Sequence, residues 1–355
     1  MRTRRGFSPV LAAALAALLW GLVFAPVRAQ QEGDEDLEEH RRRDEQYLER
    51  HRAPEDAPKG TDPAAAAERF LAAADKLIRD KNHRSIESER YRIQTDDPRL
   101  DLGAVSSLLE FFAEFFDGLW PGEPPAPSPP ARVFLFYSYH KYNQLLESDF
   151  SREVVRPAGH YGSAFDSLVI HSDPGGPTGI GDTLVHEAAH QLVDRRLYAG
   201  GARPSTWITE GLASYFEHTY MDEAGTFGAG TVGPKRIALL RGARPPARTD
   251  ARARLARLRD ALDDPQTSLA LDVASADEPA EFYGPGALER YDSSWVLVHY
   301  LLHADGGRYR EGFLRYLAAD AAGRGDVASL ERECGLDLRA LDDALAAHIK
   351  TIPVR

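Results

Sequence analysis

Two histidines four residues apart carry the clearest chemical signal in this chain, in the segment His186-Glu187-Ala188-Ala189-His190. On an α-helix, positions i and i+4 lie on the same face, so both imidazoles can reach one ion at about 2.0–2.1 Å, the zinc–nitrogen bond length. Glu187 is rotated away from that pair and can address a water molecule on the metal. The pattern predicts metal-assisted hydrolysis. Because such a five-residue match also arises by accident in about one chain in a hundred, a third ligand is needed.

Glu210 is the candidate third ligand, because it follows His190 at a distance that allows a second helix to return. A catalytic zinc site uses three protein groups and keeps one coordination position open. Nineteen residues separate the two, enough to end the first helix and turn through residues 200–204. Small residues would let the two helices approach closely, and these are Ala188, Ala189, Gly211, Ala213 and Ser214. The alternative for Glu210 is a solvated helix residue, the usual environment of glutamate.

The elements that must position these residues change in type along the chain. The first half alternates, and we expect helices at 63–81, 102–119 and 139–147 and strands at 88–95, 132–137, 160–165 and 167–171. The second half is almost all helical, at 182–198, 206–220, 234–241, 248–262, 291–303, 309–322 and 338–350. Asp182 is the expected N-cap of the motif helix. The predicted fold class is α+β, with a mixed β-sheet lobe (63–180) and a helical lobe (181–352) in one domain.

Three segments together resemble the gluzincin metallopeptidases, the zincin-like clan that includes thermolysin-like and aminopeptidase-N-like enzymes. They are the motif itself, the Trp-x-x-Glu-Gly-x-Ala-x-Tyr-Phe-Glu run at 207–217, and the Tyr-x-x-Ser-Trp-x-Leu-Val-x-Tyr-Leu run at 291–301. Small exported bacterial families of this clan are the more similar ones. The resemblance implies a zincin-like fold and a peptide or protein substrate. It also implies one Zn²⁺ held by His186, His190 and Glu210, with Glu187 as general base.

The resemblance also suggests the group that stabilises the oxyanion. Tyr291 is the expected donor, because a phenol can donate a hydrogen bond without carrying charge. Two alternatives stay open: Tyr291 only packs at a helix start, or Tyr283 in the preceding loop is the donor. His299 and His303 on the same predicted helix are interpreted as structural histidines. The strand at 167–171 is expected to border the cleft and to pair with an extended substrate.

Two departures from the clan pattern limit what the resemblance implies. No Gly-x-Met-x-Asn segment precedes the motif; Gly-Ser-Ala-Phe-Asp stands at 162–166 instead, so aminopeptidase action is the less expected one. Ser214 stands where the thermolysin group has a carboxylate that supports a zinc histidine. Asp194 could take over that support, although an ion pair with Arg195 or Arg196 is favoured for it.

The N-terminal 29 residues predict an export signal. Arg2, Arg4 and Arg5 precede an apolar run at 10–25, and Val27-Arg28-Ala29 fits a cleavage site. The alternatives are a membrane anchor in place of a cleaved signal, and the twin-arginine route in place of the general one. We expect an exported protein, periplasmic or extracellular, without a stable membrane span after cleavage. Residues 30–62 are expected to form a charged, disordered linker, and 63–352 the metallopeptidase domain.

Charge and cysteine content exclude several classes of function. The chain has a formal charge of −12, and loss of the four arginines in the signal brings it to −16. Such an acidic chain is not expected to bind nucleic acid or an anionic membrane. Cys334 is the only cysteine, so no intramolecular disulfide forms. Besides a peptidase, the sequence allows a zinc hydrolase of another amide or ester, or a non-catalytic peptide- or envelope-binding protein, and it carries no indication of oligomeric state.

Overall fold

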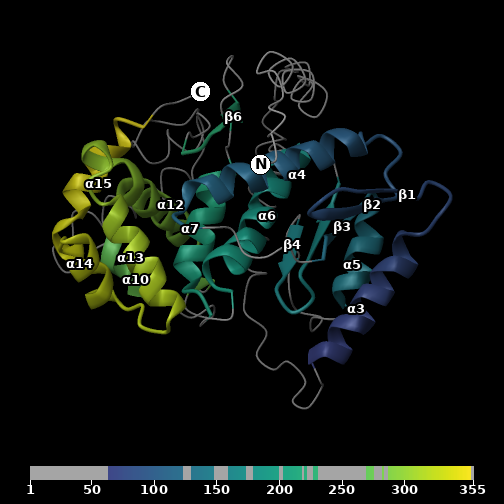
Figure 1. Ribbon diagram of the computed structural model, residues 1–355, viewed down its shortest axis with the longest axis horizontal. Coiled ribbons are helices and arrows are strands. Elements are labelled where there is room, and N and C mark those ends of the chain that lie inside the picture. The colour runs from purple at the N-terminus through teal and green to yellow at the C-terminus, as the bar shows by residue number, and fades with distance from the viewer. Residues whose placement is uncertain are drawn as a thin grey trace, which may run out of the picture.

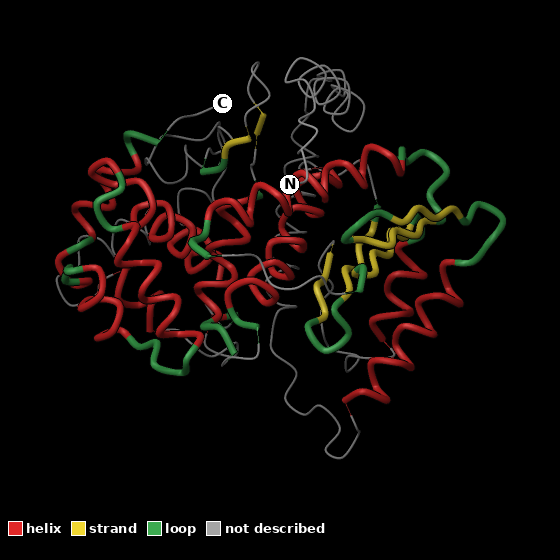
Figure 2. The backbone as a smooth tube through the Cα atoms, viewed as in Figure 1, coloured by secondary structure: helices red, strands yellow, loops and turns green. Residues whose placement is uncertain are grey.

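The computed structural model describes residues 63–122, 129–147, 159–172, 179–199, 203–217, 220–221, 227–230, 269–275, 282–283 and 287–352. The expected signal peptide and linker (1–62) and the helices expected at 234–241 and 248–262 lie outside these residues. The described chain is α+β, as predicted: a sheet half lies to the right in Figure 1 and a helical half to the left. Figure 2 shows the strands of the main sheet confined to the right-hand half.

Five strands form a mixed sheet in the order β1-β2-β3-β5-β4. The three central strands, β2 (Tyr91–Thr95), β3 (Ala131–Phe136) and β5 (Ser167–His171), are parallel. The outer strands, β1 (Arg84–Glu87) and β4 (Gly159–Gly162), run antiparallel to their neighbours. Because β5 lies between β3 and β4, both of its edges are paired. The edge strand on this side of the sheet is β4.

Two of the expected strands are shorter than the sequence pattern indicated. The strand expected at 88–95 begins at Tyr91, because the Ser88 N–H donates to the Tyr91 carbonyl at 2.8 Å and turns the chain between β1 and β2. The hairpin expected from 160–165 and 167–171 is confirmed, but its first strand ends at Gly162. The Phe165 N–H donates a hydrogen bond to the Gly162 carbonyl at 3.2 Å, which turns the chain at this point.

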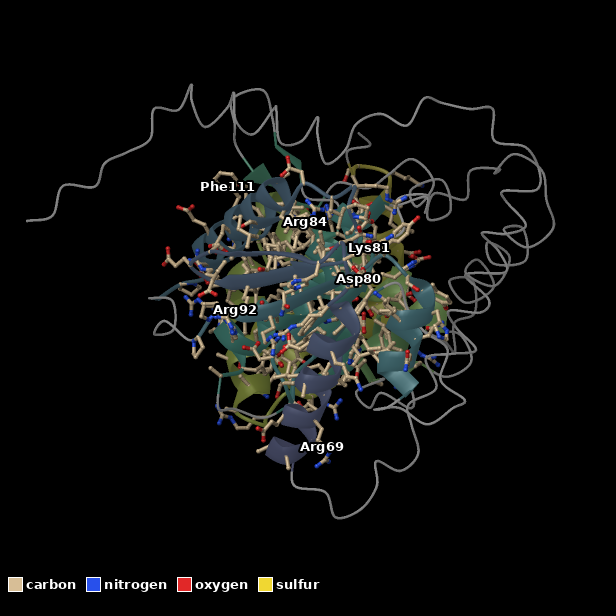
Figure 3. All side chains as sticks on the ribbon, turned by 90° about the vertical axis from the view of Figure 1, so that its right-hand side faces the viewer. Arg69, Asp80, Lys81, Arg84, Arg92 and Phe111 are labelled. Atoms are coloured by element: carbon tan, nitrogen blue, oxygen red, sulfur yellow. The ribbon has the colours of Figure 1, made fainter. Side chains whose placement is uncertain are left out.

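Helices cover both faces of this sheet and divide its core in two. The side chains of β3 alternate: Val133 and Leu135 join the core with α4 (Leu102–Leu119) and α6 (Gly179–Leu197). Phe134 and Phe136 join the core with α3 (Pro63–Ile78) and α5 (Tyr139–Glu147). Figure 3 looks onto the α3 side, where labelled charged residues such as Arg69 and Arg92 lie at the surface. The apolar faces therefore point inward on both sides of the sheet.

In the described part of the helical half the helices are α7 (Thr206–Phe216), α10 (Leu269–Ser275), α12 (Ala287–His303), α13 (Arg310–Ala321), α14 (Val327–Cys334) and α15 (Asp342–Ile349). A short hairpin, β6 (Tyr220–Met221) and β7 (Phe227–Gly228), follows α7. The helix expected at 206–220 ends at Phe216, and the one expected at 338–350 is a 3₁₀ turn (Leu338–Ala340) followed by α15. No helix among the described residues is long and apolar enough to cross a membrane.

A buried aspartate ties the end of α6 to the start of α7. Asp320 on α13 accepts hydrogen bonds from the Tyr198 hydroxyl at 2.7 Å and from the Ser205 hydroxyl at 2.9 Å. Ser205 precedes α7, but its hydroxyl bonds to Asp320 and does not cap that helix. The spacing between the two helices is thus set by a third helix more than a hundred residues along the chain.

Candidate metal centre

The motif helix α6 is surrounded by the sheet, α4, α7 and α13, and lies at the centre of Figure 1. It begins at Gly179, three residues before the expected start, so Asp182 lies in the first turn and is not the N-cap. An acidic side chain is still favourable there, because the N-terminal end of a helix carries partial positive charge. Leu184, Val185, Ala188 and Ala189 are buried and hold the helix in place.

The three predicted ligand side chains converge, and we call them the ligand cluster: His186, His190 and Glu210. The two Nε2 atoms are 3.2 Å apart. Glu210 Oε2 is 3.5 Å from His186 Nε2 and 3.6 Å from His190 Nε2. Atoms bound tetrahedrally to one zinc at about 2.0–2.1 Å would be about 3.3–3.4 Å apart. The side chains present therefore fit a four-coordinate metal ion with one position left for another ligand.

The charges of the ligand cluster also fit a cation. Glu210 Oε2 is buried without a hydrogen-bond partner. Burial opposes ionisation of Glu210, but the charge of His190, the contact with His186 and a hydrogen bond from Tyr283 lower its pKa to about 2. Burial also opposes a charged His186, yet its contact with Glu210 and the nearby carboxylates raise its pKa to about 9. Burial lowers the pKa of His190 to about 4. The ionised Glu210 thus favours a positive charge in the cluster, on a protonated histidine or on a metal cation.

Glu187 lies beside the ligand cluster and is not part of it. The backbone N–H of Tyr161 on β4 donates a hydrogen bond to its carboxylate. Burial has the largest effect on the pKa of Glu187 and raises it to about 7. The charge of His186 opposes this increase, and the charge of Glu210 adds to it. A buried carboxyl group with a pKa near neutrality can both accept and return a proton at neutral pH.

The close approach of β4 to α6 depends on a glycine. A Cβ atom on Gly159 would lie 2.6 Å from Thr183 Cγ2 and 2.8 Å from Glu187 Cγ. Both neighbours belong to the motif helix, so a larger side chain would push the edge strand away from the proposed base. Only glycine allows this strand to lie directly against α6.

Gly159→Ala is therefore expected to destabilise the protein by about 1–3 kcal/mol, the usual cost of overpacking a tight contact. Urea unfolding measures the change. Gly118→Ala on α4 is the matched control, because nothing lies within 4 Å of the added Cβ. Alanine in that helix should be neutral or stabilising by up to about 1 kcal/mol. Equal stabilities of the two variants would show that β4 is not packed tightly on α6.

Polar side chains of α6 hold the turn of the β4–β5 hairpin. Gln191 Nε2 donates to Asp166 Oδ1 at 3.0 Å, and Arg195 forms an ion pair with the same carboxylate. Asp166 has a positive φ of 44°, which is uncommon outside glycine. These contacts and the Tyr161–Glu187 hydrogen bond attach both ends of the hairpin to the motif helix.

Asp194 does not form the ion pair expected from the sequence. Arg195 pairs with Asp166, and Arg196 Nε lies 3.9 Å from an oxygen of Asp117. Asp194 is hydrogen-bonded to the Tyr161 hydroxyl, and burial raises its pKa. Its partner is thus on the edge strand, because α6 turns this residue toward β4.

The carboxylate that lies behind a histidine ligand is Glu217, at the end of α7. Its Oε2 is 4.0 Å from Nδ1 of His186, the ring nitrogen that does not face the cluster. Such a carboxylate orients a metal-binding histidine and raises its basicity. Ser214 is buried, and its hydroxyl has no hydrogen-bond partner. The sequence does contain a signal for Glu217: seven residues after Glu210 is two helical turns, so both side chains share a face.

The two tyrosine candidates lie next to each other but contact different groups. The Tyr283 hydroxyl donates a hydrogen bond to Glu210 Oε1. The Tyr291 ring packs against the rings of Phe282 and Tyr283, with centroids 5.3 and 6.3 Å away. Tyr283, the alternative candidate from the sequence, thus has its hydroxyl in contact with a ligand side chain.

Gly211 has a different role from the one expected. A Cβ there would lie 2.9 Å from the Ser294 carbonyl oxygen and 2.9 Å from Val298 Cγ2, both on α12. The glycine therefore permits close packing of α7 on α12. Ala188 and Ala189 of α6 are fully buried.

His299 and His303 belong to a separate histidine cluster with His348 of α15. Nε2 of His299 donates to the Gly230 carbonyl at 2.8 Å, which leaves Nδ1 as an acceptor for His348 Nε2 at 2.9 Å. Nε2 of His303 is 2.7 Å from the Tyr215 hydroxyl. These contacts agree with the structural interpretation of His299 and His303.

The histidine cluster should make stability depend on pH. Burial and then the neighbouring His303 and His348 lower the pKa of His299 to about 3, against about 6.5 in an unfolded chain. Between these values the unfolded state binds a proton that the folded state does not, so stability falls as the pH decreases from 6.5 toward 3. The contribution of one such group is about 1.4 kcal/mol per pH unit.

Urea unfolding between pH 7 and pH 4 tests this for wild type and His299→Gln. In the variant, the free energy of unfolding should lose the pH dependence that uptake of about one proton causes. His140→Gln, at an exposed position of α5, should not show this loss. Equal slopes for wild type and His299→Gln would contradict the assignment of a neutral, buried His299.

Comparison with known families covers the part of the chain that contains the ligand cluster. Residues 180–323 match the profile of a family described as "Protein of unknown function (DUF1570)". The matched segment runs from the start of α6 to just beyond α13, so it includes all three ligand residues and Asp320. No curated protein matches the chain. This segment is therefore similar to a family whose description assigns no function.

Proposed function

We propose that the protein is an exported zinc-dependent peptidase of the gluzincin type, with a zincin-like fold. His186, His190 and Glu210 would hold the ion, and Glu187 would be the general base. The observation that carries the proposal is the convergence of three ligand atoms beside the buried carboxyl group of Glu187. Two imidazoles and one carboxylate, with a fourth position open, are a donor set typical of catalytic zinc.

The chain's own residues would divide the work of hydrolysis. When bound, zinc lowers the pKa of a water molecule and polarises a carbonyl group. Glu187 would accept the proton of the attacking water and return it to the leaving amine. A tyrosine hydroxyl would donate to the developing oxyanion. Tyr291 is the first candidate, because the single proton of the Tyr283 hydroxyl is already donated to Glu210 Oε1, and Tyr283 remains the second.

The edge strand β4 is the proposed binding site for an extended substrate. The sequence pointed to the strand at 167–171, but β5 has β3 on one side and β4 on the other, so it has no free edge. An extended peptide could add to β4 through backbone hydrogen bonds, which would favour peptides as a class without selecting side chains. Since the Tyr161 N–H already bonds to Glu187, the remaining outward groups of β4 would bind substrate.

The test is a pair of measurements on the exported protein: zinc content after reconstitution, and cleavage of a mixed peptide library. We expect about one zinc per chain and cleavage at internal bonds, because the segment at 162–166 lacks the aminopeptidase pattern. Stoichiometric zinc without cleavage of any peptide would support a binding protein instead. Absence of metal after reconstitution would rule out the centre.

A further inference from the structure

The two oxygens of the Glu210 carboxylate have different surroundings. Oε1 accepts a hydrogen bond from the Tyr283 hydroxyl. Oε2 has no hydrogen-bond partner and faces the Nε2 atoms of His186 and His190 at 3.5 and 3.6 Å. One oxygen is therefore occupied by the protein, and the other is directed at the place where the three ligand side chains meet.

The Tyr283 ring is held in this position by other aromatic rings. The Phe282 ring is 5.4 Å away, edge to face, and the Tyr291 ring is 6.3 Å away. Phe282 is fully buried and Tyr291 nearly so. Edge-to-face and tilted arrangements are favourable for aromatic pairs. The hydroxyl is thus presented to Glu210 by a packed group of side chains, although Tyr283 comes from a different segment than any ligand.

We propose that Tyr283 is a positioning residue that keeps Glu210 a one-oxygen ligand of the metal. The inference rests on the proposed metal centre. A carboxylate can bind a metal through one oxygen or through both. If Oε1 rotated toward the ion, it would occupy the coordination position that a hydrolase must keep open. A hydrogen bond from a phenol to an ionised carboxylate is among the stronger neutral-to-charged contacts, so it can hold Oε1 away.

This role is separable from donation to an oxyanion. A donor to the oxyanion acts only when substrate is present. A residue that restrains Glu210 changes the metal's coordination in the substrate-free protein. Spectroscopy without substrate therefore distinguishes the two, independently of any peptidase activity.

The experiment replaces zinc by Co²⁺ in the full chain and compares wild type with Tyr283→Phe. Phenylalanine retains the ring and its packing but removes the hydroxyl. We expect the visible absorption of Co²⁺ to change in Tyr283→Phe, because Co²⁺ spectra report coordination number and geometry. Acetohydroxamate, a small ligand that needs the open position, should bind about 10-fold more weakly or worse, the usual effect of losing a residue that orients a ligand.

Tyr139→Phe is the matched control, since it removes a phenol hydroxyl at an exposed position of α5, away from the ligand cluster. Its substrate-free spectrum and acetohydroxamate affinity should equal those of wild type. Unchanged values in Tyr283→Phe would overturn the proposal, and so would the absence of Co²⁺ binding in wild type. A changed spectrum in a protein that cleaves no peptide would retain the positioning role and reject the peptidase, so the two failures are distinguishable. Circular dichroism confirms that each variant is folded.

Discussion

Glu187→Gln is expected to slow hydrolysis by about 10²–10⁴-fold and leave zinc binding unchanged. Glu187 is a buried carboxyl group beside the ligand cluster that is not part of it, and burial raises its pKa to about 7. Glutamine has the same shape and can still accept the hydrogen bond from the Tyr161 N–H, but it cannot take up a proton. General-base catalysis contributes about 10²–10⁴-fold, so the rate of peptide cleavage should fall by that factor.

The measurement combines zinc content with cleavage of the best peptide from the library. Glu311→Gln, at an exposed position of α13, makes the same chemical change away from the cluster and should retain full activity. A Glu187→Gln protein that cleaves peptide at the wild-type rate would exclude Glu187 as the base. Loss of zinc in this variant would mean that Glu187 maintains the geometry of α6 instead of moving protons.

Glu210→Gln is expected to weaken zinc binding by more than about 100-fold, beyond the 10–100-fold typical of residues that only orient a ligand. The Glu210 pKa of about 2 keeps the carboxylate ionised, and Oε2 is buried without a partner of its own. The glutamine side chain has the same size but carries no negative charge to attract a cation. Competition with a chromophoric chelator measures the affinity.

Glu217→Gln makes the matched comparison for this prediction. It also replaces a carboxylate of α7 by an amide, but Glu217 faces the Nδ1 atom of His186 at 4.0 Å and not the centre of the cluster. Its effect on zinc affinity should stay within about 10–100-fold. Equal losses in the two variants would mean that Glu210 orients the histidines and does not bind the metal. The difference between the variants separates a ligand from the residue that supports one.

The sequence alone determined the parts of this site that depend on local geometry. An α-helix places residues i and i+4 on one face whatever surrounds it, so the pairing of His186 with His190 followed from their spacing. The helix at 102–119 and the strand at 167–171 were also predicted at their observed bounds, because apolar spacing identifies the buried side of an element. The helix α14 was not predicted, although its capping residues are local: Asp326 accepts from the Ser329 N–H, and Gly335 ends the helix with a φ of 65°.

Only the tertiary structure decided which residues surround those local elements. The sheet order brings β4 to the edge beside α6 although β5 precedes that helix in the chain, and no periodicity encodes which strand is outermost. Tyr283 contacts Glu210 from 73 residues further along the chain, and Asp320 connects the end of α6 to the start of α7 from over a hundred residues away. The spacing of residues along one helix identifies candidate ligands, because the helical backbone has a regular period. Contacts between elements, which no local pattern specifies, decide which oxygen of Glu210 faces the histidines and which strand lies beside Glu187.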